Sequence, residues 1–189
     1  MQIVTKEEVE LKPHIFIKEI LDGKLFIHPT DTIFGIGAIA TEDEPVRRIR
    51  EIKQTENPFS IIVPNLEWVY QNCEVNKLAE EWLKKLPGPF TLILKLKNKE
   101  AISPEVNKGR DTVGIRLPNH WISRFVSQLN HPFVSTAATR SEGSIIEGPE
   151  DLEKIHVDNI HYFIHHDIML RRPSIVVDLS KGEPVFLRR

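Results

Sequence analysis

Short apolar runs bounded by turn residues alternate along the chain with segments whose apolar positions recur at helical spacing. The runs have strand composition: LFIHP (25–29), FSIIV (59–63), FTLILKLK (90–97), TVGIRLP (112–118), the start of PFVSTAATRSEGS (132–144), HYFI (161–164), SIVVDL (174–179) and PVFLRR (184–189). The helical segments are TEDEPVRRIREIK (41–53), KLAEEWLKKL (77–86) and WISRFVSQL (121–129). This alternation predicts a mixed α/β fold.

The first helical segment carries signals for both of its ends. Thr41 is followed three positions later by Glu44, which is the spacing of a capping box and predicts a helix start there. Apolar side chains recur on one side from Val46 to Ile52. The segment therefore predicts a helix that ends near Lys53.

Length and composition bound the organisation of the chain. A chain of 189 residues, 40% apolar and 28% charged, is long enough to bury one sizeable core. Because no long linker or repeat interrupts it, we expect residues 1–189 to form a single domain. The net charge of −2 points to no polyanionic partner, so binding of nucleic acid would need a local basic groove.

The lone cysteine and the absence of long apolar runs indicate the compartment. Cys73 cannot form an intramolecular disulfide and is interpreted as an inert core residue, as expected in a reducing environment. No run approaches the ~18 apolar residues of a membrane span, and the polar N-terminus does not resemble a signal peptide. We expect a cytoplasmic protein with no membrane partner.

Three polar clusters lie at or beside the ends of predicted strands: PTDT (29–32), TVGIR (112–116) and STAATRSEGS (135–144). Ligands bind at strand ends in open α/β sheets. Hydroxyls and backbone N–H groups suit phosphate and carboxylate oxygens, and an arginine can hold a carboxylate through two hydrogen bonds. Each cluster taken alone is also compatible with ordinary turn chemistry.

The sequence HHD (165–167) is a weaker candidate for a metal site. Adjacent histidines at the exit of a strand point to different faces, so a surface loop is the better interpretation. We expect no metal ligands among the side chains.

Seven segments together resemble one family. PTDTIFGIG, the helix ending REIK, NPFSIIV, PGPFTLIL, TVGIRLPNH, PFVSTAATRSEG and PSIVVDL occur in the order and spacing of the YrdC-like threonylcarbamoyl-AMP synthases. The resemblance implies a twisted mixed sheet with flanking helices around a large open cavity. It also implies condensation of L-threonine, bicarbonate and ATP to threonylcarbamoyl-adenylate and pyrophosphate, for threonylcarbamoyladenosine modification of tRNA beside the anticodon.

The resemblance assigns roles to individual positions. Lys53 matches a basic residue at the cavity rim, where an ammonium could offset charge on the α-phosphoryl group, although a helix-capping cation is the alternative. The positions matching the threonine site are Thr32, Arg116 and Thr136, and those matching the ATP site are Asn57, Thr112, Thr139, Ser141 and Arg188. Arg188 could equally be a solvated terminal charge.

The implied partners follow from the reaction. Mg²⁺ would accompany ATP, bound to its phosphates with few or no protein ligands. A second enzyme system would take the product, and tRNA or double-stranded RNA remains open as a partner. A polar site should reject valine, which lacks the threonine hydroxyl.

The chain departs from the family pattern at several positions. Where the family has Lys-x-Arg and Ser-x-Asn, this chain has Lys53-Gln54-Thr55 and Ala137-Ala138-Thr139, with Arg140 as a nearby cation; Ile175 follows Ser174 where threonine is usual. These changes keep open a diverged paralogue that binds RNA or a nucleotide without forming the adenylate. Carbamoyl transfer to another acceptor is a third reading.

Overall fold

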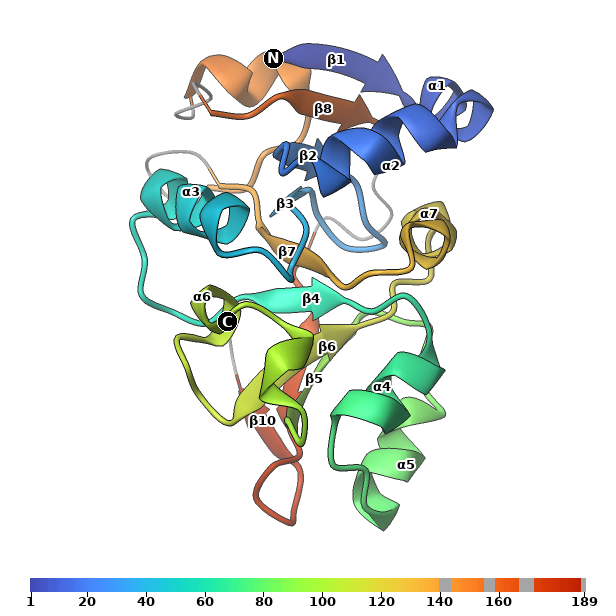
Figure 1. Ribbon diagram of the computed structural model, residues 1–189, viewed down its shortest axis with the longest axis vertical. Coiled ribbons are helices and arrows are strands. Elements are labelled where there is room, and N and C mark those ends of the chain that lie inside the picture. Colours follow the sequence, from blue (N-terminus) through green and yellow to red (C-terminus); the bar gives the residue numbers. More distant parts are fainter. Residues whose placement is uncertain (140–143, 155–158, 167–171, 188–189) are drawn as a thin grey trace.

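The computed structural model describes residues 1–139, 144–154, 159–166 and 172–187, and Figure 1 shows their arrangement. Ten strands form one mixed sheet in the order β1-β8-β2-β3-β7-β4-β6-β5-β9-β10. The strands are β1 (Gln2–Thr5), β2 (Phe26–His28), β3 (Gly35–Gly37), β4 (Ser60–Ile62), β5 (Phe90–Lys95), β6 (Thr112–Arg116), β7 (Phe133–Ala137), β8 (Tyr162–His165), β9 (Ile175–Asp178) and β10 (Val185–Leu187).

Seven α-helices and two short 3₁₀ helices are present among the described residues. They are α1 (Lys6–Leu11), α2 (Pro13–Leu21), α3 (Asp43–Lys53), α4 (Leu66–Asn72), α5 (Lys77–Leu83), η1 (Lys99–Ala101), α6 (Pro104–Asn107), α7 (Trp121–Leu129) and η2 (Pro149–Lys154). None of the described helices is long and apolar enough to cross a membrane. The α/β prediction is confirmed.

Every strand predicted from an apolar run is found, but two strands were not predicted. β1 has only one buried residue, Val4, so its sequence shows little alternation. β3 consists of Gly35, Ile36 and Gly37, and glycine is normally depleted in strands. A Cβ at Gly37 would lie 2.4 Å from both Phe133 Cε1 and Val134 O, so the close approach of β7 requires glycine there.

The capping box predicted at Thr41 is wrong. Helix α3 begins at Asp43 with Glu42 as its N-cap and no side-chain cap bond. A start at Thr41 would put Pro45 at the fourth helical position, where a proline cannot supply the first intrahelical N–H. Starting at Asp43 moves Pro45 into the first turn, where no donor is needed. The end at Lys53 was predicted correctly.

A capping box does occur at the N-terminus, where it was overlooked. The Thr5 hydroxyl accepts from Glu8 N at 3.3 Å, and the Glu8 carboxylate accepts from Thr5 N at 2.7 Å. This box starts α1 directly after β1.

Two apolar clusters occupy the two faces of the sheet. Helices α1, α2 and α7 contribute to one cluster, and α3 to α6 contribute to the other. On the α7 face, Ile62 and Phe133 are large and pack against the helices. Two positions along the same strands lie the small Ser60 and Ser135, and Gly114 pairs with Ser60. This change from large to small residues leaves room for a cavity on this face of the sheet.

Candidate functional site

A cavity of about 140 Å³ lies where β3, β7, β4 and β6 meet near the middle of the sheet. Its lining comes from five separate parts of the chain: Thr32, Ile33, Phe34, Gly35, Ser60, Arg116, Ser135, Thr136, Ala137, Pro173 and Ser174. Part of each of the three polar clusters predicted from sequence contributes to this lining. The three clusters therefore meet at one cavity, which was not predicted from their positions in the sequence.

One end of the cavity is formed by Arg116, at the end of β6, and by the loop between β2 and β3. The Arg116 Nη2 group donates to Asp31 Oδ1 and to Thr32 Oγ1, each at 3.0 Å. Asp31 and Arg116 are 3% and 6% exposed. A buried arginine and aspartate that are hydrogen-bonded to each other can both remain charged away from water.

Thr30 and Thr32 form a connected pair of hydroxyls next to Arg116. The Thr30 hydroxyl donates to Ile33 O at 2.7 Å, and its oxygen accepts from the Thr32 and Ile33 N–H groups. The two threonine oxygens lie 2.9 Å apart. The Thr32 oxygen accepts from Arg116 and also lines the cavity.

Lys53 does not line the cavity itself but lies beside its other end, where α3 meets the end of β7 at the lining residue Ala137. Its Nζ donates to Ala137 O at 2.8 Å and to Thr139 Oγ1 at 2.7 Å. Both partners are neutral, and no carboxylate lies within ion-pair distance of Lys53 among the described residues. Burial lowers the pKa of Lys53. An ammonium held only by neutral oxygens is suited to attract an anion.

The floor between the two ends is rich in hydroxyls. Within the described part of the chain, the hydroxyls of Ser60, Ser135 and Thr136 line the cavity without a hydrogen-bond partner of their own. The Ser174 hydroxyl lies 2.7 Å from Thr91 Oγ1. Such a floor can hydrogen-bond a small polar ligand in several orientations.

His28 lies beside the floor and is neutral. Its side chain is fully buried, and burial lowers the pKa to about 3. The Nδ1 group contacts Pro29 O at 3.2 Å, which makes it the protonated nitrogen. His28 therefore adds no positive charge next to Arg116.

The structure brings five of the predicted site residues together and separates two others from the cavity. Thr32, Arg116 and Thr136 line the cavity, and Lys53 and Thr139 are joined at its end. Two predicted ATP positions do not line it: Asn57 is exposed, and Thr112 lies at the start of β6. Ser141 and Arg188 lie outside the described residues, as does Arg140. The binding roles of all of these residues stay predictions.

Sequence reasoning missed the small residues of the floor and the role of Asp31. Ser60 was hidden inside the apolar run FSIIV, although its alternation with Ile62 on one face of β4 could have identified it. Asp31 lies inside the quoted motif PTDT, but its contact with Arg116 joins residues 85 positions apart. No local pattern could have revealed that contact.

The described histidines provide no metal site. His165 ends β8 and is exposed, and the His166 ring lies 5.4 Å from the ring of His120. Asp167 lies outside the described residues. Among the residues that the structure does describe, no three His, Cys, Asp or Glu side chains gather as metal ligands would.

Cys73 is buried at 1% exposure, as expected of a core residue. Burial raises the pKa of its thiol to about 12, so the thiol stays protonated and unreactive at neutral pH.

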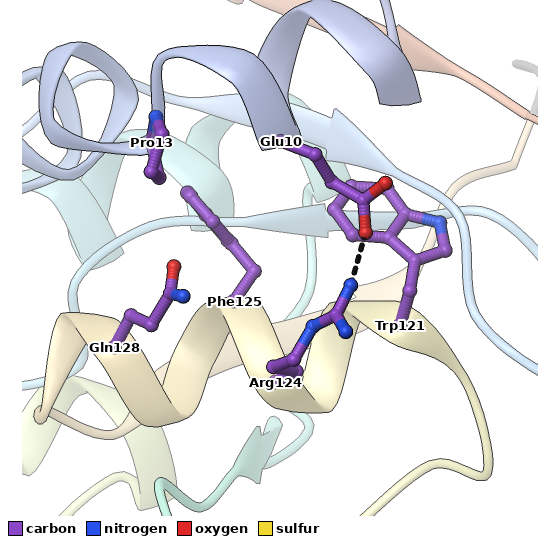
Figure 2. Close-up of a pocket in the computed structure, with 6 residues that line it drawn as sticks. All are labelled: Glu10, Pro13, Trp121, Arg124, Phe125 and Gln128. Carbon is purple, nitrogen blue, oxygen red and sulfur yellow. Dashed lines mark hydrogen bonds and ion pairs between the residues drawn. The ribbon is translucent and has the colours of Figure 1, made fainter.

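A second hollow of about 270 Å³ lies between the α1–α2 connection and α7 (Figure 2). Figure 2 shows Arg124 bonded to Glu10 across it, with Trp121 and Phe125 on the helix side. It shares no lining residue with the cavity described above. The two hollows are therefore separate features of the surface.

Comparison with known proteins identifies the family. Residues 18–189 match the model of the Sua5/YciO/YrdC family, whose description reads "Telomere recombination". A relative from Methanocaldococcus jannaschii, whose name assigns it provisionally to the threonylcarbamoyl-AMP synthases, is 33% identical over 90% of this chain and 82% of its own. The threonylcarbamoyl-AMP synthase of Pyrococcus abyssi is 30% identical over 95% of this chain, which spans only 54% of that protein's length.

Solved structures agree with the sequence comparisons. The P. abyssi Sua5 structure complexed with L-threonine superposes with a TM-score of 0.87 at 29% identity, covering 100% of this chain and 57% of that one. Escherichia coli YciO gives a TM-score of 0.84 at 22% identity, over 100% of this chain and 95% of its own, which shows the shared fold. The expected twisted mixed sheet with flanking helices is thus confirmed, and this chain belongs to the Sua5/YciO/YrdC family.

Proposed function

We propose that this chain is a threonylcarbamoyl-AMP synthase. It would condense L-threonine, bicarbonate and ATP into threonylcarbamoyl-adenylate and pyrophosphate, which makes it a nucleotidyltransferase. The observation that carries the proposal is the pairing of a buried Arg116–Asp31–Thr32 cluster with Lys53 at opposite ends of one small cavity. Two relatives named for this reaction, and a threonine-bound relative of the same fold, add support.

The size of the cavity suits the amino acid. Pockets that enclose drug-sized ligands measure roughly 300–1,000 Å³, so about 140 Å³ is enough for an amino acid but too small for a nucleotide as well. ATP would therefore extend past Lys53, toward the side of β6 where Thr112 lies. The threonine carboxylate would bind at the Arg116 end.

The Thr32 hydroxyl oxygen would accept a hydrogen bond from the substrate amine. This oxygen accepts from Arg116 and lines the cavity, where it can also accept from a donor on a ligand. An amine N–H is a suitable donor to it. The neutral amine would add to carbon dioxide with loss of an N–H proton, or react with bicarbonate with loss of water, giving a carbamate oriented by contacts at both of its ends.

The second step would occur at the Lys53 end. A carbamate oxygen attacks the α-phosphorus of ATP, the bond to the β-phosphate oxygen breaks, and pyrophosphate leaves with the negative charge. An ammonium with no carboxylate of its own in the described structure would stabilise charge that develops on the phosphoryl oxygens. Lys53 is the residue we assign to this role.

Mg²⁺ is part of the proposal as a companion of ATP. Asp31, a carboxylate next to the lining residues Arg116 and Thr32, is bound to Arg116 and to Asn119 N, so it is not available as a metal ligand. The phosphates themselves would bind the ion, which screens their charge.

The product and its partners complete the proposal. The threonylcarbamoyl-adenylate would pass to a transferase that modifies tRNA next to the anticodon, in the cytoplasm. tRNA itself would meet this protein only if a basic surface is available, because the net charge of −2 gives no general attraction for RNA.

Mass spectrometry of the reaction products tests the proposal. Purified protein is incubated with ATP, Mg²⁺ and bicarbonate, with L-threonine in one sample and L-valine in the other. We expect a threonine-dependent acyl-adenylate and pyrophosphate, and little product with valine. Intact ATP in both samples, under conditions in which threonine still binds, would refute synthase activity.

A further inference from the structure

Asp31 connects the loop between β2 and β3 with two points on the segment that leads from β6 into α7. Its Oδ1 accepts from Arg116 Nη2 at 3.0 Å, and its Oδ2 accepts from the backbone N–H of Asn119 at 2.9 Å. The carboxylate is 3% exposed and does not line the cavity. It therefore cannot act on a ligand directly.

The two contacts of Asp31 fix the arginine in both position and direction. Asn119 lies three residues after Arg116, in the segment just before α7. One carboxylate oxygen therefore binds the backbone of this segment, and the other binds the guanidinium. Arg116 Nη2 has two hydrogens, and these go to Asp31 and Thr32. Through these contacts Asp31 sets the angle at which the guanidinium faces the cavity.

The charge of Asp31 matters as much as its geometry. Arg116 is 6% exposed, and a buried guanidinium without a paired carboxylate would pull water into the site or move toward solvent. With Asp31 in place the pair is neutral overall, so the arginine can stay desolvated before the ligand arrives. The neutral pair attracts a second carboxylate less strongly than a bare guanidinium would, but the fixed position of Arg116 reduces the cost of reorganisation on binding.

We propose that Asp31 is a positioning residue, which orients Arg116 for the carboxylate of the amino-acid substrate. This inference rests on the proposed function, because it takes threonine as the ligand of Arg116. Two substitutions of Asp31 should lower threonine affinity to different degrees. Asp31→Asn keeps the shape and removes the charge, and Asp31→Glu keeps the charge.

Asp31→Asn must also lose one of the two contacts. An asparagine side chain has one oxygen and one NH₂ group, so either Arg116 or Asn119 N would face a donor in place of an acceptor. We expect threonine affinity, measured by isothermal titration calorimetry, to fall about 10- to 100-fold, since a hydrogen bond between charged groups contributes ~1.5–3 kcal/mol. Affinity for ATP should stay within about twofold. Asp31→Glu should recover part of the loss.

Asp178→Asn is the matched control. Asp178 is also a buried aspartate, at 8% exposure, and it accepts from Ser180 N at 2.9 Å outside the cavity. Threonine affinity should be unchanged in this variant. A loss of threonine affinity as large as that of Asp31→Asn would mean that the effect is one of general stability, and it would overturn the proposal.

A double-mutant cycle tests whether Asp31 acts through Arg116. In an Arg116→Met background, Asp31→Asn should have no further effect on threonine affinity, because there is no guanidinium left to orient. A full additional loss in that background would overturn the inference. Unchanged threonine affinity in the single Asp31→Asn variant would also overturn it while leaving the proposed function intact.

The proposed function can fail separately. If the unmodified protein binds no threonine at millimolar concentration, the amino-acid site itself is wrong, and the inference about Asp31 falls with it. If the protein binds threonine but forms no adenylate, the synthase proposal fails, whereas the role of Asp31 is still decided by the calorimetry.

Discussion

The two ends of the cavity are built in opposite ways. At one end Arg116 is paired with a carboxylate, and both partners are buried. At the other end Lys53 is held by a backbone carbonyl and a threonine hydroxyl, in a segment whose sequence departs from the family pattern. The end that would recognise the amino acid is thus held by a buried ion pair, whereas the end that would meet the phosphates is held by neutral contacts.

The difference has a physical origin. A buried ion pair tolerates little change, because the loss of either member leaves a charge without compensation. Lys53 is half-buried and bound to neutral groups, so replacement of a neighbouring arginine by Thr55 leaves its own hydrogen bonds intact. Ala137 supplies its backbone oxygen to Lys53, an interaction that needs no particular side chain. The altered positions therefore lie where substitution disturbs the fold least.

The largest expected effect is at Arg116. Replacing it with methionine removes the proposed carboxylate contact and leaves Asp31 buried alone, so we expect threonine affinity to fall at least ~30-fold and stability to drop by about 3–5 kcal/mol. The double variant Asp31→Asn with Arg116→Met should regain most of that stability but none of the affinity. Calorimetry and denaturant unfolding measure the two quantities. Restored threonine binding in the double variant would contradict the assignment of Arg116.

Lys53 should have the next largest effect, on a different quantity. We expect Lys53→Met to lower kcat by about 10- to 100-fold, which corresponds to ~1.5–3 kcal/mol for a charged hydrogen bond. Threonine affinity should change less than about twofold, because the Arg116 end is untouched. Lys53→Arg, which keeps the charge, serves as the control. Equal losses in kcat and threonine affinity would mean that the two ends do not act separately.

The lowered pKa of Lys53 gives the third prediction. Burial favours the neutral amine, so the catalytic cation should be lost on raising the pH at a lower value than ~10.4, the pKa of an ordinary lysine. Activity should fall there, and in the Lys53→Arg variant that fall should be absent. Between the folded and unfolded pKa values the unfolded chain binds more protons at this group, so its contribution to stability rises with pH. A parallel loss of activity and stability at Lys53 would contradict this account.

The smallest expected effect is a gain. Thr55 occupies the position where the family has arginine; its hydroxyl accepts from Asn57 N, and its carbonyl accepts from Arg50. Thr55→Arg would add a cation at the rim, and an exposed ion pair is worth ~0.5–1 kcal/mol, or about two- to fivefold in kcat/KM for ATP. Thr55→Gln loses the same hydroxyl without adding charge and is the control. A gain in both variants would exclude charge as the cause.

The sequence was sufficient to predict the strands that form apolar runs and the helices whose apolar residues recur at helical spacing. The apolar runs gave eight strands, and the helices 41–53, 77–86 and 121–129 were found with errors only at their ends. β3 was missed because its glycines reflect contacts with distant residues: a Cβ at Gly37 would meet Phe133, 96 positions away, and a Cβ at Gly35 would meet His28 and Ser135. Resemblance to a family supplied Thr32, Arg116 and Lys53, which local patterns alone could not distinguish from turn residues.

The remaining part of the site depends on contacts between distant segments. Asp31 meets Arg116 and Asn119 only after β2, β3 and β6 have come together. The hydroxyl floor likewise follows from strand register, because Ser60 pairs with Ser135 on one side and with Gly114 on the other. Register is a property of the assembled sheet, and one sequence alone does not specify it.

β7 has a consequence for how the molecule opens. In the described sheet this strand alone bridges the four strands on the β1 side and the five on the β10 side, through its pairing with β3 and β4. Separating those halves requires breaking one of the two ladders of Phe133–Ala137, whereas exposing the whole strand requires breaking both, so its amides should exchange with solvent among the slowest in the protein. A ligand in the cavity would contact residues from both halves of the sheet, such as Thr32 on the β1 side and Ser60 on the β10 side. Its binding would slow that separation and make the two halves unfold as one cooperative unit.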